Sequence, residues 1–249
     1  MSKALQGKVA LVTGGSRGIG AAIARRLAAD GADVIFSYVS SADKANALVS
    51  ELEKTGVRAA AFAADQADAQ QVTALVQKAA KHFGRLDILI NNAGVAAYHD
   101  ITTAEADEAA LERQFAINVH AVATAVRAAV PHLPKGGRIV SIGSVLGERS
   151  PIAAISGYSA TKAAIAGYTR GWARDLGPRG ITVNVVNPGL TDTDMNPDEG
   201  DFADAMKKNT ALGRYGTPAE IAAAVVFLAG PEASYITGVT LNVDGGINA

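Results

Sequence analysis

The chain of 249 residues contains no cysteine, which excludes disulfides, thiolate nucleophiles and cysteine-ligated metals. This composition fits a reducing compartment, and we expect a cytoplasmic protein. Histidines are also few, at positions 82, 99, 120 and 132, and their spacing matches no metal-ligand motif. We therefore expect no metal site.

Long apolar runs and an excess of charge of one sign are missing too. The run AAAVVFLA is far shorter than the ~20 residues that a membrane-spanning helix needs. The 23 basic and 24 acidic side chains are scattered, so no surface field favours nucleic acid or anionic lipid. A 49% apolar composition at this length is enough to bury one full core. We predict one domain over residues 1–249, with a small-molecule partner, no nucleic acid and no membrane.

Short apolar runs rich in β-branched residues alternate with longer helical patterns along the chain. The runs are continuously apolar, which indicates burial on both faces and so a parallel sheet between two helical layers. Right-handed crossovers then give a doubly wound fold. We predict an α/β, single-domain, Rossmann-type doubly wound seven-stranded parallel sheet with helices on both faces. The predicted strands are 8–13, 33–38, 58–64, 86–91, 137–143, 181–187 and 239–245.

Residues 13–20 read TGGSRGIG and join the first predicted strand to a helix. Glycine lets backbone N–H groups approach a pyrophosphate there, and the helix dipole adds attraction. A tight turn without a ligand is the alternative for the loop alone. Ala21 and Ala22 follow where an ATP-binding phosphate loop needs lysine and a hydroxyl, so a dinucleotide is favoured. The predicted contacts are Gly14, Ser16, Arg17, Gly18, Ile19 and Gly20.

The second predicted strand bears on which dinucleotide is bound. An acid at its end would bind the ribose 2′-hydroxyl of NAD, but Tyr38 stands there, followed by Ser40 and Ser41. Arg17 can offer a forked cation to a 2′-phosphate, and the serines can offer hydroxyl donors. A solvated arginine and capping serines are the alternative reading of each residue. Together with the missing acid, these residues favour NADP(H) over NAD(H).

Tyr158 and Lys162 lie four residues apart in a predicted helix and so share one face. In isolation such a pair is an ordinary surface tyrosine beside a solvated lysine. Ser144 follows the fifth predicted strand, at the sheet edge where this fold binds ligands. The surrounding SIGSVLG lacks the G-x-S-x-G pattern of a hydrolase.

These motifs occur together, and their combination resembles the short-chain dehydrogenase/reductase family over nearly the whole chain. The resemblance implies hydride transfer between NADP(H) and a carbonyl carbon. The residues that carry it are TGGSRGIG, Asp65, NNAG at 91–94, Asn118, Ser144, the pair Tyr158 and Lys162, and Pro188-Gly189.

Reduction of a carbonyl needs a positioned acid that protonates the developing alkoxide, and Tyr158 can be that acid. An ammonium nearby favours a phenolate, so we predict that Lys162 and the positive nicotinamide ring of the cofactor together lower the pKa of Tyr158. Ser144 would donate a hydrogen bond to the substrate oxygen. The resemblance implies that Asn118, in the predicted helix LERQFAINVHAVATAV, ties Lys162 to a proton-relaying water.

The resemblance also implies the remaining cofactor contacts. Asp65 and Gln66 would lie near the adenine, Lys162 would bind the nicotinamide ribose, and Tyr158 would also contact the cofactor. The other contacts are Asn91, Ala93 and Gly94 along the adenine ribose and phosphates, Ile142 beneath the nicotinamide, and Pro188, Gly189, Thr191 and Thr193 at the carboxamide.

The segment 190–213 is rich in Asp, Asn, Pro and Gly, and we predict a mobile lid that orders on binding, with a plain surface excursion as the alternative. The segments 95–102 and 146–156 would line the same mouth. The predicted substrate contacts are Ser144, Leu146, Ile152, Tyr158, Leu190 and Met195.

Our first functional expectation is an NADPH-dependent reductase of ketones or aldehydes. β-Ketoacyl-acyl-carrier-protein reductases are similar, and Arg179 suits an acidic carrier. The stretch AAVPHLPKGGR departs from the several basic residues that they commonly carry there, so this role comes second. A secondary-alcohol or sugar dehydrogenase is third. A non-catalytic dinucleotide-sensing protein is a different class, which typically loses the tyrosine or the lysine. The stretch ITGVTLNVDGG resembles the strand at a homotetramer interface.

Overall fold

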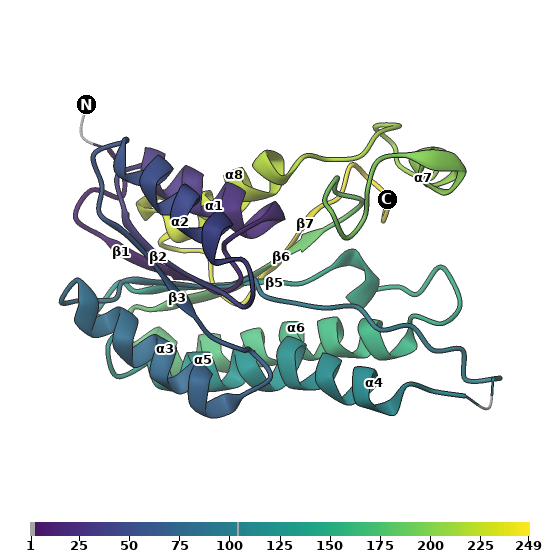
Figure 1. Cartoon of the computed structure of the whole chain (residues 1–249), viewed down its shortest axis with the longest axis horizontal. Helices are drawn as coiled ribbons and strands as arrows, with labels where there is room; N and C mark the ends of the chain where they lie inside the picture. Colours follow the sequence, from purple (N-terminus) through teal and green to yellow (C-terminus); the bar gives the residue numbers. More distant parts are fainter. Residues whose placement is uncertain (1–2, 104) are drawn as a thin grey trace.

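The computed structural model describes residues 3–103 and 105–249, and it confirms the predicted sheet. Seven strands form one sheet in the order β3-β2-β1-β4-β5-β6-β7, and each neighbouring pair is parallel (Figure 1). The strands are β1 (Val9–Val12), β2 (Asp33–Tyr38), β3 (Ala59–Ala63), β4 (Ile88–Asn91), β5 (Arg138–Ile142), β6 (Thr182–Pro188) and β7 (Thr240–Val243).

Helices cover both faces of the sheet, as Figure 1 shows. Within the described ranges, no helix has the length and hydropathy of a membrane span. One layer contains α1 (Gly18–Ala29), α2 (Ala42–Glu53) and α8 (Pro218–Ala229), the other contains α3 (Ala69–His82), α4 (Glu108–Phe115), α5 (Ala121–Ala129) and α6 (Ser156–Leu176), and α7 (Gly200–Lys207) lies beyond the strand ends. Short 3₁₀ turns occupy Val145–Gly147, Gly177–Arg179 and Pro231–Ala233.

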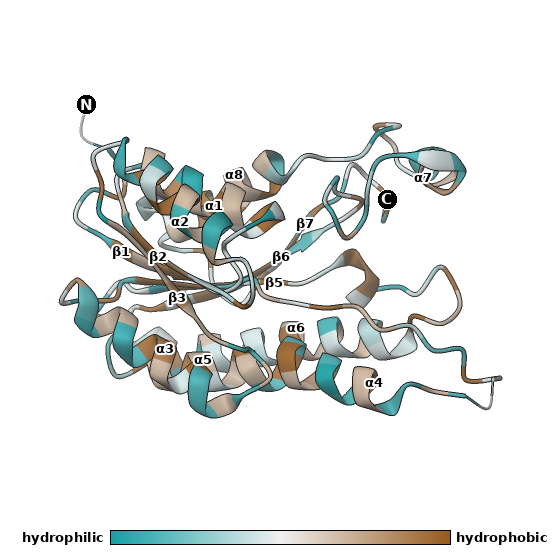
Figure 2. Ribbon diagram, in the orientation of Figure 1, coloured by the Kyte–Doolittle hydropathy of each residue, from teal (hydrophilic) through white to brown (hydrophobic). Residues whose placement is uncertain are grey.

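The core lies on both faces of the sheet, which explains the continuously apolar strands. In β1, Ala10 and Val12 pack toward α1, α2 and α8, whereas Val9 and Leu11 pack toward α3, α5 and α6. Figure 2 shows the same pattern, with hydrophobic residues along the strands and hydrophilic ones on the outer helix faces. Because side chains alternate along a strand, both sides of each strand must be apolar here.

The strand order reverses between β1 and β4, and this reversal places the site. From β1 the chain winds outward to β2 and β3, then returns to β4 and winds the other way. The connections after β1 and β4 therefore diverge, and they leave a crevice beyond the carboxyl ends of these two strands.

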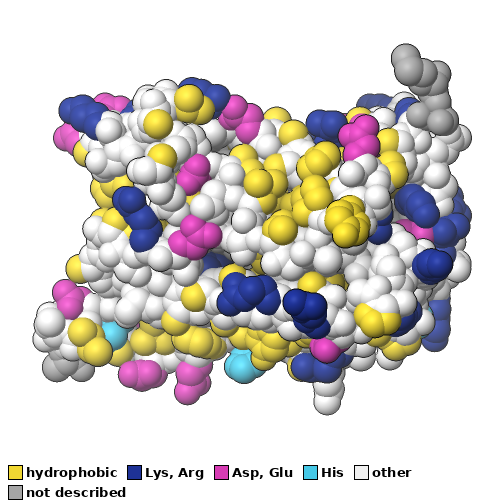
Figure 3. All heavy atoms as spheres, turned by 180° about the vertical axis from the view of Figure 1, so that it is seen from behind, with side chains coloured by type: hydrophobic (Ala, Val, Ile, Leu, Met, Phe, Trp, Pro, Cys, Tyr) yellow, Lys and Arg dark blue, Asp and Glu magenta, His cyan; other side chains and the backbone are white. Residues whose placement is uncertain are grey.

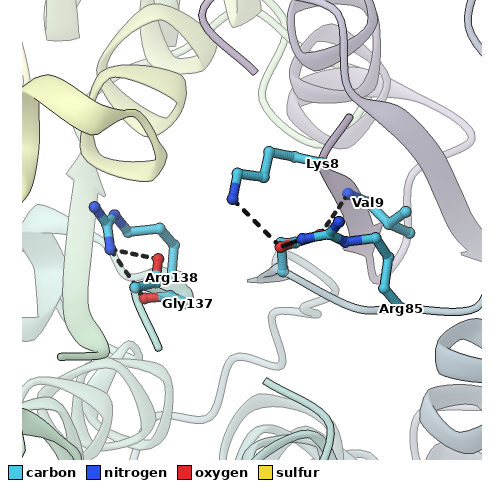
Figure 4. A network of polar contacts seen from close by, with 7 residues as sticks. Lys8, Val9, Arg85, Gly137 and Arg138 are labelled. Atoms are coloured by element: carbon cyan, nitrogen blue, oxygen red, sulfur yellow. Dashed lines mark hydrogen bonds and ion pairs between the residues drawn. The ribbon is translucent and has the colours of Figure 1, made fainter. Parts of the chain in front are cut away.

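A charged cluster around the buried Asp87 and Arg138, with Arg85 exposed, holds the opposite, amino-terminal edge of the sheet (Figure 4). Asp87 accepts hydrogen bonds from Val9 N at 3.0 Å and from Arg85 Nη2 at 2.6 Å. Arg138 Nη1 donates to the Gly137 carbonyl at 3.2 Å. A buried N–H left without an acceptor costs about 1–3 kcal/mol. We therefore assign this cluster a role in stability, remote from the crevice.

Candidate active site

The glycine loop after β1 tolerates no larger residue at its tightest point. Gly14 and Gly18 have φ angles of +64° and +52°, which favour glycine. A Cβ at Gly20 would collide with the Gly14 carbonyl and lie 2.5 Å from Asn92 Nδ2. No side chain of the described residues caps the start of α1, so its first N–H groups are open toward the crevice. This loop fits a pyrophosphate.

Asn92 braces this loop, a role that the sequence reasoning missed. Its Nδ2 donates to the carbonyls of Thr13 at 2.9 Å and Gly14 at 3.0 Å. The predicted contact Asn91 instead has a buried side chain that donates to Ser141 Oγ at 3.1 Å. Asn92 lies in the same NNAG motif as the predicted Ala93 and Gly94, so the motif marks the place but does not show which side chain braces the loop.

The predicted adenosine contacts lie along one side of the crevice. Tyr38 ends β2, Ser40 is exposed, and Ser41 precedes α2 without capping it. Arg17 is exposed and forms an ion pair with Asp194 of the lid segment at 3.5 Å.

Asp65 and Gln66 follow β3. The Asp65 carboxylate accepts hydrogen bonds from Arg113 Nη2 at 2.9 and 3.1 Å. Gln66 is buried, and its Nε2 has no hydrogen-bond partner among the described residues. Asp65 is thus already held by α4, whereas Gln66 retains a free donor at the strand end.

Tyr158 and Lys162 both lie on the face of α6 that turns toward the strand ends. Lys162 is buried, and its Nζ lies 5.6 Å from the centroid of the Tyr158 ring. The same Nζ donates to the Ile142 carbonyl, at the end of β5, at 3.0 Å. The structure thus brings together the predicted phenol, ammonium and Ile142.

The expectation of a lowered phenol pKa is wrong for the protein alone. Burial raises the pKa of Tyr158 to about 12 because the phenolate loses hydration; the Ser144 hydroxyl opposes this rise and Tyr98 adds to it. Burial also lowers the pKa of Lys162 to about 8 because the ammonium loses hydration. Tyr158 therefore holds its proton firmly, whereas Lys162 can lose one slightly above neutral pH.

Asn118 lies in a π-helical turn, Ala116–His120, and not in the continuous α-helix that we predicted. This turn lies between α4 and α5, and π-helical turns occur often at functional sites. The Asn118 Oδ1 accepts from Val95 N at 2.9 Å, and its Nδ2 donates to Val95 O at 2.8 Å and to Thr161 Oγ1 at 3.1 Å. The side chain thus ties the segment after β4 to α6.

Ser144 ends the segment after β5, and its Oγ accepts from Leu146 N at 3.1 Å. Pro188 ends β6, and the buried Thr191 donates to the Gly189 carbonyl at 3.3 Å.

The segment 190–213, for which we predicted a lid, passes beside the glycine loop near its start. A Cβ at Gly18 would lie 3.6 Å from the Thr193 methyl group. The predicted substrate contacts Ile152 and Met195 are exposed, at 43% and 56%, and Leu146 and Leu190 are half-buried.

Two aromatic side chains were not predicted. Tyr98 and Phe202 are 66% and 61% exposed, and they come from the segment after β4 and from α7 in the lid segment. The neighbouring His99 N donates to the Ala154 carbonyl at 3.0 Å, so the backbone of Tyr98 lies beside the segment that leads into Tyr158. The sequence alone does not distinguish an exposed aromatic residue from one in the core, so neither residue could be predicted as a contact.

Comparison with known proteins identifies the family of the chain. Residues 14–248 match the family model described as enoyl-(acyl carrier protein) reductase. The chain is 47% identical over 246 residues to the cyclic-di-GMP-binding biofilm dispersal mediator protein of Escherichia coli (strain K12), with 99% of each chain covered.

Two solved structures are similar over the same length. A short-chain dehydrogenase from Burkholderia cenocepacia in complex with NADP has a TM-score of 0.95 at 53% identity, over 99% of this chain and 100% of that one. A blue fluorescent protein from a metagenomic library in complex with NADPH has a TM-score of 0.96 at 52% identity, with the same coverage. With a glycine loop, Ser144, Tyr158 and Lys162 at the strand ends and matches over nearly its whole length, the chain belongs to the short-chain dehydrogenase/reductase family.

Proposed function

We propose that this oxidoreductase uses NADPH to reduce a ketone or aldehyde to an alcohol. The observation that carries the proposal is the convergence of Ser144, Tyr158 and Lys162 beside a glycine loop that fits a pyrophosphate. NADPH, when bound, supplies the hydride. The similar Burkholderia and metagenomic proteins, which were solved with NADP and NADPH, support this choice of cofactor.

The side chains then handle the proton. Ser144 donates a hydrogen bond to the carbonyl oxygen, and Tyr158 gives its proton to the developing alkoxide. A phenol with a pKa of about 12 is a weak acid, but an alkoxide is more basic still, so this transfer is downhill. Lys162, with a pKa of about 8, supplies positive charge beside the phenolate and the proton that restores it. Asn118 fixes α6 against the segment after β4.

In the protein without its cofactor, burial keeps Tyr158 protonated. Oxidation of an alcohol would need Tyr158 as a base, so we rank a secondary-alcohol or sugar dehydrogenase below a carbonyl reductase.

NADP(H) is proposed over NAD(H) because Tyr38 replaces the acid that would repel a 2′-phosphate. Arg17 is exposed in the glycine loop, and its one ion pair among the described residues is a long, exposed pair with Asp194. Exposed pairs contribute about 0–1 kcal/mol, so a phosphate can compete for this guanidinium.

We expect Tyr38→Asp to shift the ratio of kcat/KM values from NADPH toward NADH by at least tenfold. A carboxylate there would accept hydrogen bonds from the ribose hydroxyls and repel a phosphate. Initial rates with both cofactors measure the ratio, and Tyr38→Asn is the uncharged control. An unchanged ratio would place the 2′-phosphate site elsewhere.

The exposed apolar side chains of the segments after β4, β5 and β6 favour an uncharged substrate. Ile152, Met195, Tyr98 and Phe202 expose apolar surface from the elements that follow the strand ends. We propose that the lid segment, which joins the glycine loop through Arg17 and Asp194, closes over the bound substrate.

A panel of ketones and aldehydes, assayed by NADPH consumption with the alcohol identified, tests the proposal. A carrier-bound β-ketoacyl thioester belongs in the panel, because an acyl-carrier role is the second candidate. We expect the free apolar ketones to be turned over faster than the carrier-bound one. NADPH binding without any turnover would contradict the proposal.

A dinucleotide-sensing role is the alternative from a different class. The similar E. coli protein is named for cyclic-di-GMP binding. A sensor has no need of a proton donor with electrostatic support, yet Tyr158 and Lys162 are both present and close together. Their retention makes catalysis the better supported function.

We also propose a cytoplasmic homotetramer. Apolar side chains gather on the face shown in Figure 3. Among the described strands β7 pairs with β6 alone, Phe227 of α8 is exposed, and the exposed Tyr168 stacks on Trp172 of α6. Open edges and apolar faces are usually covered in closed symmetric assemblies. Light scattering should give four times the 25.4 kDa chain mass, and a monomer would contradict this.

A further inference from the structure

One buried amide near the site has no role in the proposed chemistry. Gln114, in the last turn of α4, is fully buried. Its Oε1 accepts a hydrogen bond from Ala97 N at 2.6 Å, and its Nε2 has no partner among the described residues. A buried donor without a partner is costly, so an apolar residue would suit this position better unless the Oε1 contact matters.

The space for this amide depends on a glycine beside the proton donor. A Cβ at Gly157 would lie 3.3 Å from Gln114 Nε2, which is tighter than ordinary packing. Gly157 directly precedes Tyr158 in α6. The Gln114 amide therefore lies between the start of α6 and the segment after β4.

The side-chain amides of Gln114 and Asn118, on neighbouring helical turns, hold the segment after β4. Asn118 binds both backbone groups of Val95, and Gln114 binds Ala97 N. Both act on the backbone, so they fix the path of the segment whatever its side chains are.

Tyr98 is held between two anchored neighbours. Ala97 N is bound by Gln114, and His99 N donates to the Ala154 carbonyl at 3.0 Å. Ala154 has a φ of +65°, a conformation that alanine seldom adopts and that occurs often at functional sites. Tyr98 itself is 66% exposed, so its own packing cannot hold it in place.

We infer that Gln114 is a positioning residue for substrate binding, which holds Tyr98 beside the start of α6, where Tyr158 lies, through the backbone of Ala97. The inference rests on the proposed carbonyl reduction, and it assigns Tyr98 as a contact that selects the substrate. Gln114 itself does not touch the reacting atoms.

The test replaces Gln114 by Met, which has a similar volume and no acceptor for Ala97. We expect the KM for an apolar ketone to rise about fivefold, the factor that a typical hydrogen bond represents. We expect kcat to change less than twofold and the Kd for NADPH to stay the same. Equal losses in kcat and NADPH affinity would indicate a general structural role and contradict the inference.

A double-mutant cycle with Tyr98→Ala makes the test specific. If Gln114 acts through Tyr98, Gln114→Met should have little further effect on KM once Tyr98 is removed. Independent, additive effects would overturn the inference. Thr182→Val is the matched control, because Thr182 also has a buried group without a partner among the described residues but lies at the amino end of β6. It should leave KM at the wild-type value.

Amide hydrogen exchange keeps this inference separate from the proposed reaction. Gln114→Met should speed exchange at the Ala97 amide while the core strands stay protected. This measurement needs no turnover. If the enzyme is inactive, the proposed reductase function is refuted, but exchange still tests whether Gln114 holds the backbone of Ala97. Unchanged exchange at Ala97 would overturn the anchoring.

Discussion

Tyr158→Phe is expected to lower kcat for carbonyl reduction by about 10²–10⁴-fold, the range typical for loss of a positioned general acid. Phenylalanine keeps the ring in its half-buried position and removes only the hydroxyl whose pKa burial raises to about 12. The Kd for NADPH should change little, since the glycine loop and Lys162 remain. Steady-state kinetics and a fluorescence titration with NADPH measure the two quantities.

Tyr168→Phe is the matched control for this prediction. Tyr168 lies on the same helix α6, but it is exposed and stacked on Trp172. This variant should keep wild-type turnover. If Tyr158→Phe keeps most of its activity, or if both variants lose activity equally, Tyr158 is not the proton donor.

Lys162→Met is expected to lower kcat/KM by about 10²-fold or more, because it removes both the charge beside the phenol and a nicotinamide-side contact. Since the pKa of Lys162 is about 8, wild-type reduction should decline as the pH rises through 8 and the ammonium loses its proton. The variant has no such group and should show no decline there. Rates from pH 6 to 10 give both profiles.

Stability should respond in the opposite direction to activity. The pKa of Lys162 is lowered from 10.5 to about 8, so the unfolded chain binds more protons between these values. The free energy of unfolding of the wild type therefore rises as the pH increases from 8 toward 10.5, and that of Lys162→Met does not. If Lys162→Met keeps the decline in the rate of reduction above pH 8, a group other than Lys162 causes that decline.

The fold was predictable because its signals are local. Each strand is a short continuous apolar run, and Gly14 and Gly18 need the positive φ angles that the loop requires. The handedness of the crossovers then gives a doubly wound sheet with helices on both faces, but the order of the strands was not predicted. That Ser144, Tyr158 and Lys162 carry the reaction stays a prediction. It rests on a serine after the fifth strand together with a tyrosine and a lysine four residues apart in one helix.

The remaining features depend on contacts between distant segments. The π-helical turn at Asn118 forms where α4 and α5 pack on α6, and no propensity in AINVH marks it. The pKa of Tyr158 depends on how deeply its hydroxyl is buried, and the sequence shows only that Lys162 is one turn away. The link from Gln114 to Ala97 joins residues 17 positions apart through a loop.

Transfer of deuterium from labelled NADPH tests the central claim most directly. A ketone that is turned over is reduced with NADPH carrying deuterium at either of the two C4 positions, and the alcohol is analysed by mass spectrometry. We predict deuterium at the carbinol carbon from one labelled form and none from the other, because one face of the bound nicotinamide meets the carbonyl beside Tyr158. Alcohol without deuterium from either form, or no alcohol from any carbonyl tested, would contradict the account.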